Sequence, residues 1–142
     1  MLQQNAVPPA TLELLINDIK VDFVLYPFPW SQSFDTFEDI ILLSVDDIIP
    51  TKLQAVSNRN AKKDYWDIAF LLKQYSLTRM LKIFKTKFPQ IDIGFIIHSL
   101  TDFEKADTEP DPDIYINVTW PEIKLQLTSE VKKYTEGLLG FK

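Results

Sequence analysis

The sequence predicts an α+β fold that is mostly helical, with a small antiparallel two-stranded sheet near the N-terminus followed by a helical bundle. Strand-like patterns occur only early in the chain, where residues 18–26 alternate in character and residues 39–45 form a short apolar run. Beyond them, apolar residues recur at helical spacing between prolines and cap-forming residues. With 142 residues, 46% of them hydrophobic, the chain is able to bury a core. We therefore expect one compact unit, with strands in residues 1–45 and helices in residues 46–142.

The N-terminal elements are predicted from alternation and from turn residues. Residues 1–10 end in two prolines and are expected to be irregular, and Thr11 is expected to cap a short helical turn through Leu15. The alternating strand 18–26 is expected to pair antiparallel with 39–45. Because an isolated two-stranded sheet is only marginally stable, helices should cover it or further strands should come from outside this chain.

The first helix is expected to begin near Asp46 or Asp47 as its N-cap and to end near Asn58. Pro50 is tolerated there if it falls in the first turn, where a missing N–H costs nothing. Residues 101–119 contain two prolines and are expected to form a loop. The remaining helices are expected at about 61–75, 77–88, 91–100 and 121–136.

Composition excludes several classes of site and location. The chain has no cysteine, so it holds neither a disulfide framework nor a thiolate zinc site. No apolar run approaches the roughly 20 residues of a membrane span, and the first residues do not resemble a signal peptide, so we expect a cytoplasmic protein without membrane association. The net charge of −5 argues against non-specific duplex binding. Basic residues nevertheless gather between Lys52 and Lys87, and a local basic surface there suits a nucleotide or RNA.

Charged residues on the apolar stripes of the two central helices are the strongest indication of a site. At about 100° per residue, Lys52 falls at the centre of the stripe of the first helix and Arg59 lies beside it. Asp64 falls inside the stripe of the second helix and Asp67 at its edge. An unpaired buried charge costs several kcal/mol, so each of these groups should have a partner or border a wet cleft.

Two interpretations of these charges stay open. In the structural one, Asp64 pairs with Arg59 or Lys52 and locks the helices together. In the functional one, the same cations steady the phosphate oxygens of a nucleoside triphosphate. Lys62 and Lys63, at the start of the second helix, are expected to point away from the stripe.

Weaker signals come from single residues. Asp22 lies on the less apolar face of the strand 18–26, as either a solvated residue or a metal or base position. His98 is expected in the core or at a helix end, and the acidic run 102–113 is expected to be a solvated loop. Trp66 lies opposite the buried stripe of its helix, where it packs on another helix or marks an interface.

Three segments of the chain resemble the AbiEii/AbiGii family of nucleotidyltransferase-like toxins. They are DIIPTKLQAVSNRNAKKDYWDIAFLL, the upstream IKVDFVLYPFPW, and IIHSLTDFEKADTEPDP with the following Trp120. The resemblance covers about residues 18–135 and implies a partial nucleotidyltransferase fold, with residues 1–45 as the remnant of its palm. Members are cytoplasmic toxins of bacterial toxin–antitoxin, or abortive-infection, systems of phage defence, which transfer nucleotides to targets such as tRNA.

The resemblance implies roles for six residues and for several ligands. Asp22 corresponds to the strand carboxylate, catalytic and metal-binding, while Lys52 and Asp64 correspond to the catalytic residues of the helical half. The nucleotide-binding positions would be Arg59, Lys63 and Asp67. In the intact family the cofactors are Mg²⁺ and an NTP, and the partners are an antitoxin protein and a nucleotide acceptor such as tRNA.

One family feature is missing. Members begin with a Gly-Gly-Thr or Gly-Ser motif and an Asp-x-Asp pair, and neither precedes Asp22 here. Because two metal ions need several carboxylates, we expect the C-terminal portion of a Mg²⁺-dependent nucleotidyltransferase that by itself binds no cofactor and transfers nothing. The alternatives are a non-catalytic protein-binding module or a truncated remnant in which the inward charges are structural. Unpaired strand edges would favour a homo-oligomer.

Overall fold

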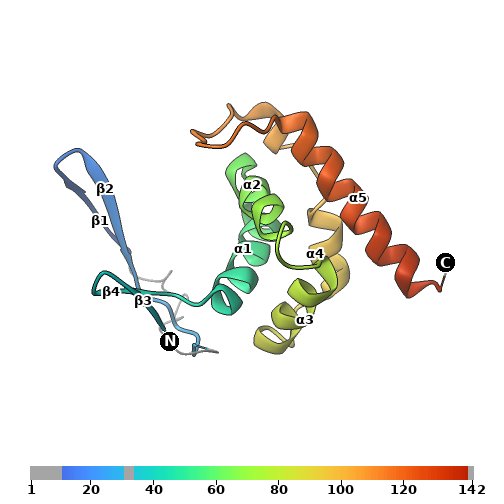
Figure 1. Ribbon diagram of the computed structural model, residues 1–142, viewed down its shortest axis with the longest axis horizontal. Helices are drawn as coiled ribbons and strands as arrows, with labels where there is room; N and C mark the ends of the chain where they lie inside the picture. The colour runs from blue at the N-terminus through green and yellow to red at the C-terminus, as the bar shows by residue number, and fades with distance from the viewer. Residues whose placement is uncertain (1–10, 31–33, 141–142) are drawn as a thin grey trace, which may run out of the picture. The chain divides into compact units, whose positions relative to one another are not determined.

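The computed structural model describes residues 11–30 and 34–140, in two units, Met1–Trp30 and Ser31–Lys142 (Figure 1). The change from strands to helices falls at Val45, close to the predicted residue 46, whereas the division into units falls earlier, after Trp30. The expected irregular lead-in, residues 1–10, lies outside the described residues.

The first unit contains a β-hairpin. Strand β1, Thr11–Ile16, pairs antiparallel with β2, Ile19–Val24. The two turn residues, Asn17 and Asp18, both have positive φ, 49° and 63°, as a tight hairpin turn requires, and Asn and Asp tolerate that conformation. The predicted helical turn from Thr11 to Leu15 is therefore wrong. The Asn-Asp turn brings these residues directly opposite the alternating strand, and pairing there overrides a lone capping residue.

A second hairpin precedes the helices. Strand β3, Asp35–Phe37, pairs antiparallel with β4, Ile40–Leu42, through another two-residue turn with positive φ. The predicted pairing of 18–26 with 39–45 is wrong, because each strand pairs with its immediate neighbour in the sequence. Closing a two-residue turn costs less chain entropy than closing the long connection that the predicted pairing needs. The α+β class, with a small antiparallel sheet near the N-terminus, is confirmed.

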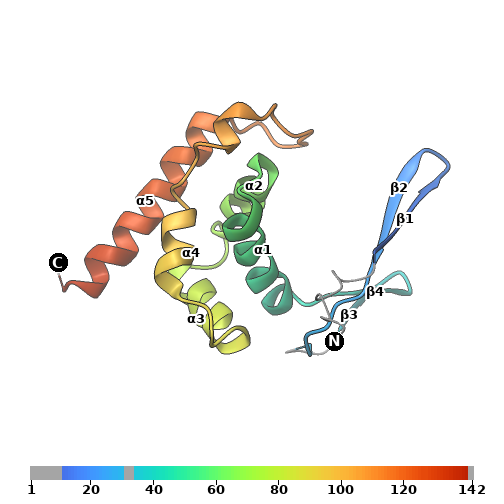
Figure 2. The ribbon, with the colours of Figure 1, turned by 180° about the vertical axis from the view of Figure 1, so that it is seen from behind.

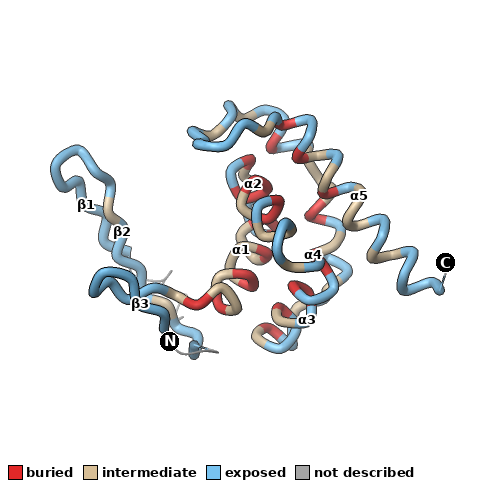
Figure 3. Tube along the Cα trace, viewed as in Figure 1, coloured by how far each residue is buried: buried red, intermediate tan, exposed pale blue. Residues whose placement is uncertain are grey.

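The β1–β2 hairpin has one wholly apolar face. Residues directly opposite each other share a face, so three cross-strand pairs lie together. These are Leu12 with Phe23, Leu14 with Val21, and Ile16 with Ile19. All except the half-buried Val21 are exposed, and Figure 3 shows the hairpin almost entirely as exposed surface.

The helical unit contains five helices among the described residues, at positions close to those predicted. They are α1, Val45–Arg59; α2, Lys62–Leu71; α3, Leu77–Lys87; α4, Ile93–Ser99; and α5, Trp120–Leu138, with a short 3₁₀ turn at Ala106–Thr108. The N-cap of α1 is Ser44, whose hydroxyl accepts from the N–H of Asp47, and not Asp46 or Asp47 as predicted. The helix therefore starts earlier, and Pro50 lies in its second turn rather than its first.

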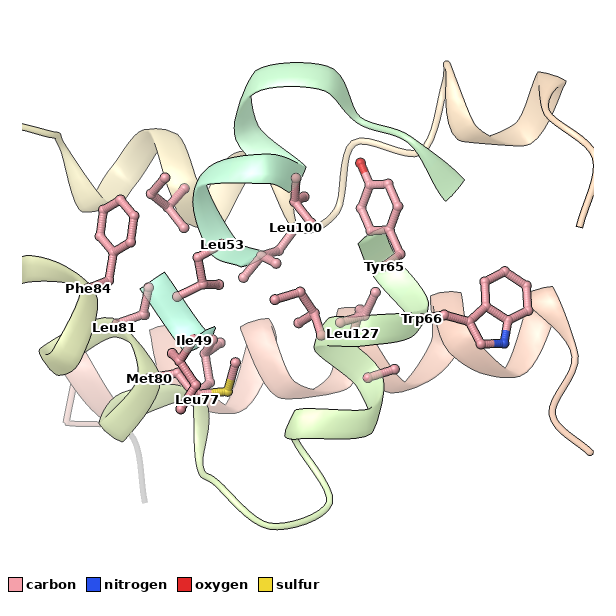
Figure 4. Close-up of a cluster of buried hydrophobic side chains, with 14 of the residues drawn as sticks. Ile49, Leu53, Tyr65, Trp66, Leu77, Met80, Leu81, Phe84, Leu100 and Leu127 are labelled. Atoms are coloured by element: carbon pink, nitrogen blue, oxygen red, sulfur yellow. The ribbon is translucent and has the colours of Figure 1, made fainter. Parts of the chain in front are cut away.

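The core forms where α1 meets the other helices. Helix α1 packs against α2, α3 and α4, and α5 runs along the outside against α2 and α3 (Figures 1 and 2). The stripe that α1 buries consists of Ile49, Leu53 and Val56, each with no exposed surface. Figure 4 shows Ile49 and Leu53 among large apolar side chains from α2, α3 and α5.

Aromatic stacking attaches α5 to α2. Trp66 is 5% exposed and stacks on Trp120, with ring centroids 5.3 Å apart and planes 15° from parallel. Of the two interpretations of Trp66, packing on another helix is therefore confirmed. None of the helices in the described ranges is long and apolar enough to cross a membrane.

Candidate functional site

A bidentate ion pair lies at the corner between α1 and α2. Nε of Arg59 donates to Oδ2 of Asp64 at 2.7 Å, and Nη2 donates to Oδ1 at 2.6 Å. Asp64 has no exposed surface, whereas the Arg59 side chain is 51% exposed. The fork geometry satisfies both carboxylate oxygens at once. The structural expectation that Asp64 pairs with Arg59 is confirmed.

The corner is made by one residue in a left-handed conformation. Arg59 ends α1, and Asn60 has φ 49° and ψ 35°, a conformation that asparagine tolerates better than most residues. Helix α2 then begins at Lys62, which places Asp64 in its first turn. The side chain of Asn60 donates to the hydroxyl of Tyr65 at 3.0 Å, so the turn is also bonded to the helix that follows.

A second ion pair joins the same helices. Nζ of Lys52 donates to Oδ2 of Asp67 at 2.7 Å, and both side chains are more than a third exposed. Lys52 was predicted at the centre of the buried stripe; this prediction is wrong, because Leu53 occupies the stripe and the Lys52 side chain is 37% exposed. The hydrogen bond with Asp64 is the main cause that raises the pKa of Arg59, and the charge of Asp67 adds to it.

The acidic loop binds the first turn of α2. The backbone N–H of Lys62 donates to Oε2 of Glu109 at 2.7 Å, and its Nζ lies 3.0 Å from Oδ1 of Asp111. Lys62 is 5% exposed, so the prediction that it points away is wrong. Helix N-termini leave N–H groups without internal partners, and Glu109 satisfies one of them. Part of the acidic run 102–113 therefore binds the first turn of α2, so the run is not only a solvated loop.

Two open hollows flank the corner, and both are lined by acidic residues. One, of about 430 Å³, includes the exposed Lys63 beside Glu109, Asp111 and Asp113. The other, of about 370 Å³, is lined by Asn60, Asp102, Glu104, Lys105 and Thr108. Carboxylates repel a triphosphate, so the side of the corner with Lys52 and Arg59 suits an anion better.

Asp22 lies in the other unit, on the polar face of the β1–β2 hairpin. Glu13 is its direct cross-strand partner, and Nζ of Lys20 lies 3.6 Å from Asp22 and 3.4 Å from Glu13. The hydrogen bond with Glu13 is the largest cause that raises the pKa of Lys20. Glu13 was missed because its segment was predicted as a helical turn. The alternation in TLELLI was the signal that could have found it.

A family model described as nucleotidyl transferase AbiEii toxin, Type IV TA system, matches residues 6–136. The chain belongs to the AbiEii family. It is 33% identical over 131 residues to the uncharacterized protein aq_aa25 of Aquifex aeolicus (strain VF5), a match that covers 89% of this chain. The match covers 63% of that relative, so the chain spans less than two thirds of its length. No solved structure matches.

The carboxylates of this AbiEii-family chain that are candidates for metal binding already have cationic partners. Both oxygens of Asp64 accept from Arg59, Asp67 accepts from Lys52, and Asp22 neighbours Lys20. Within residues 11–30 and 34–140, no three His, Asp or Glu side chains are grouped as metal ligands. A two-metal site needs carboxylates that hold both ions a few ångströms apart. The carboxylates of the described residues therefore do not fit a two-metal site.

A buried ion pair that the sequence did not reveal fixes the other end of α1. Nζ of Lys87 donates to Oδ1 of Asp47 at 2.6 Å, with side-chain exposures of 4% and 0%. The hydroxyl of Ser44 also donates to Asp47, at 3.0 Å. Asp47 was predicted only as a cap, and the two residues are 40 positions apart. No local pattern could have paired them.

Tyr65 ties the α1–α2 corner to the loop after α4. Its hydroxyl lies within hydrogen-bond distance of the carbonyl oxygens of Ser99 and Asp102, and it has no exposed surface. Burial is the main cause that raises the pKa of Tyr65 to about 12. The neutral phenol is therefore the form that the fold requires.

The Tyr65→Phe variant should be less stable than the wild type at pH 7 by about 1–3 kcal/mol, because buried carbonyl oxygens lose their donor. The pKa is raised in the folded state, so this stabilisation is complete below the ordinary value of 10 and is lost as pH rises towards 12. The difference in unfolding free energy between the two proteins, measured with urea, should shrink between pH 10 and pH 12. A difference that stays constant over that range would show that the hydroxyl is not held neutral.

Proposed function

We propose that this chain is the C-terminal portion of a Mg²⁺-dependent nucleotidyltransferase in which Lys52 and Arg59 bind the phosphate oxygens of an NTP. The observation that carries the proposal is the pair of half-exposed cations on α1, each held by a carboxylate of α2 at 2.6–2.7 Å. Such pairing fixes the cations before a ligand arrives, which reduces the entropy lost on binding. Family membership supplies the reaction class.

Arg59 is well arranged for this role. Its Nε and Nη2 are used by Asp64, and Nη1 has no hydrogen bond to any described residue, so it remains for an anion. We propose Asp64 as the residue that positions this guanidinium and Asp67 as the residue that positions Lys52. Lys63 is proposed as a further nucleotide-binding residue on the family resemblance alone, since the carboxylates Glu109, Asp111 and Asp113 line the hollow beside it and disfavour an anion there.

The metal ions need more carboxylates than the described residues group together. Asp22 is proposed as the metal-binding carboxylate of the hairpin. We propose that the remaining ligands, and the glycine-rich loop that cradles phosphates in the family, are not contributed by this chain. The chain alone would then be inactive. In the complete enzyme we propose a cytoplasmic phage-defence toxin, with an antitoxin partner and tRNA or a similar acceptor.

The purified chain, incubated with radiolabelled NTPs, Mg²⁺ and total tRNA, should show no incorporation of label. Weak NTP binding, followed by calorimetry, should be present in the wild type and at least about tenfold weaker in Lys52→Ala, which removes one phosphate contact. Lys105→Ala removes a lysine bonded to the Arg59 carbonyl oxygen and serves as the control that should retain binding. Incorporation by the wild type and not by Lys52→Ala would contradict the proposed inactivity.

A second candidate is a protein-binding module whose charges are structural. Two observations favour it: the complete use of both Asp64 oxygens by Arg59, and the exposed apolar face of the β1–β2 hairpin. Large exposed apolar patches mark interaction surfaces. If the calorimetry shows no NTP binding at all, this candidate replaces the first.

A further inference from the structure

One stretch of this acidic chain contains basic residues and no acidic ones. Residues 68–91 contain five basic residues and no acidic one, while the whole chain has 15 basic and 20 acidic residues. The rest of the chain therefore has 10 basic residues (15 − 5) against all 20 acidic ones. The five are Lys73, Arg79, Lys82, Lys85 and Lys87. A local field of this kind attracts anions even when the net charge is negative.

Helix α3 carries four of these five basic residues. Lys87 is buried against Asp47 and Arg79 lies 3.5 Å from Asp46, so Lys82 and Lys85 are the two without a carboxylate partner among the described residues. The apolar face of α3 is buried. On its exposed face Lys82 follows Thr78 by four residues, Lys85 follows Lys82 by three, and Thr86 comes directly after Lys85. These four residues line an open hollow of about 380 Å³ together with Leu81, Ile93 and Tyr134. We call it the α3–α5 groove. No carboxylate is among its lining residues.

The two lysines of the groove are not neutralised by carboxylates. Lys82 makes no hydrogen bond, ion pair or ring contact with any residue of the described ranges. Nζ of Lys85 donates to the carbonyl oxygens of Pro89 at 2.7 Å and Ile91 at 3.2 Å, which hold the ammonium without cancelling its charge. By contrast, Lys132 and Lys133 on α5 pair with Glu136 and Glu130.

We propose that the α3–α5 groove binds the phosphate backbone of a single-stranded nucleic acid. Lys82 and Lys85 contact phosphates one helical turn apart, and the hydroxyl of Thr78 donates to a phosphate oxygen. Tyr134 provides an aromatic ring against which a base packs, a combination that binds single strands without sequence preference. The groove is separate from the Lys52 and Arg59 side chains, so the binding does not depend on the proposed nucleotide transfer.

A hollow with an aromatic wall favours a nucleic acid over a lipid surface. Membrane-surface helices present a broad apolar face flanked by cations. The apolar face of α3, with Leu77, Met80, Leu81 and Phe84, is instead buried in the core. What α3 offers to a ligand is therefore charge and hydroxyl groups, which suit phosphates.

The test is binding of a fluorescent, mixed-sequence, 20-nucleotide single-stranded RNA to the full chain at several salt concentrations. Lys82→Glu/Lys85→Glu should weaken binding at low salt by at least about tenfold, and it should reduce the slope of log K against log salt by about 1.4, or 0.7 for each lost phosphate contact. Lys132→Glu/Lys133→Glu, with the same change of charge on α5, should weaken binding much less. Lys82→Gln/Lys85→Gln, which adds no negative charge, guards against a folding defect and should show the same reduced slope.

Three results would overturn the proposal. The first is the absence of RNA binding by the wild type, and the second is an equal loss in the α3 and α5 double variants, which would indicate an effect of net charge alone. The third is binding to vesicles of phosphatidylserine and phosphatidylcholine that needs Lys82 and Lys85 while RNA binding does not. Retained RNA binding in a chain that shows no NTP binding would leave this proposal standing and remove only the proposed nucleotide site.

Discussion

Replacement of Lys87 by methionine is expected to lower the free energy of unfolding by about 3–5 kcal/mol, the cost of breaking a buried ion pair by removing one partner. The variant removes the ammonium 2.6 Å from Oδ1 of Asp47 and leaves that carboxylate where it has no exposed surface. Methionine keeps most of the side-chain volume, so the decrease in unfolding free energy comes from the lost charge more than from lost packing. Urea denaturation at pH 7 measures it.

The control for this variant is Lys82→Met on the same helix. Lys82 is exposed and makes no ion pair with a described residue, so its replacement should change stability by less than about 0.5 kcal/mol. The double variant Asp47→Asn/Lys87→Met should recover part of the loss, because no charge remains buried. A Lys87→Met protein as stable as Lys82→Met would mean that the Asp47 carboxylate does not depend on Lys87, because water or its other partners, such as Ser44, satisfy it.

Replacement of Asp64 by asparagine should cost about 2–4 kcal/mol of stability. Asparagine keeps one oxygen that still accepts from Arg59 but turns an amide N–H₂ towards the other guanidinium donor. One of the two hydrogen bonds of 2.6 and 2.7 Å is therefore lost, the other loses its negative charge, and a buried donor is left without an acceptor. Arg59 is half exposed and regains water, which keeps the cost below that of a fully buried pair. The melting temperature and urea midpoint measure the change.

Asp67→Asn is the matched control, since it makes the same substitution three residues later in the same helix. Both partners of the Asp67 pair are more than a third exposed, so its loss should cost less than about 1 kcal/mol. If Asp64→Asn costs no more than Asp67→Asn, the Arg59–Asp64 pair does not lock the corner. Asp64 would then be held for a ligand and not for stability.

Helical periodicity in the sequence places Asp64 correctly in the core and places Lys52 there wrongly. Asp64 was expected among apolar residues and in need of a cation, and it is buried and bound by Arg59. For α1 the predicted stripe was centred one residue away from the observed one, so Leu53 is buried and Lys52 is not. The packing of α2, α3 and α4 against α1 sets which face is inside.

For the strands as well, the local pattern predicted the element correctly but not the strand with which it pairs. The alternation of residues 18–26 placed a strand and assigned Asp22 to the polar face, as the register of β1 and β2 bears out. The partner strand was assigned wrongly, because two-residue turns of Asn-Asp and Glu-Asp at positive φ were not recognised without glycine. Each strand pairs with its neighbour in the chain because the turn between them is short. This nearness can be read from the sequence, but the pattern of apolar residues does not indicate it.

By itself, the sequence determined the α+β class, the approximate helix boundaries and the need of Asp64 for a cation, with Arg59 or Lys52 as the two candidates. These depend on interactions within a few residues, such as helical periodicity, proline placement and a corner five residues long. Only the tertiary structure decided that Asp47 pairs with Lys87, that Lys62 is buried under the acidic loop, and that Lys82 and Lys85 share a groove with Tyr134. Such contacts join residues 40 or more positions apart, and helix packing, not any local pattern, determines which of them meet.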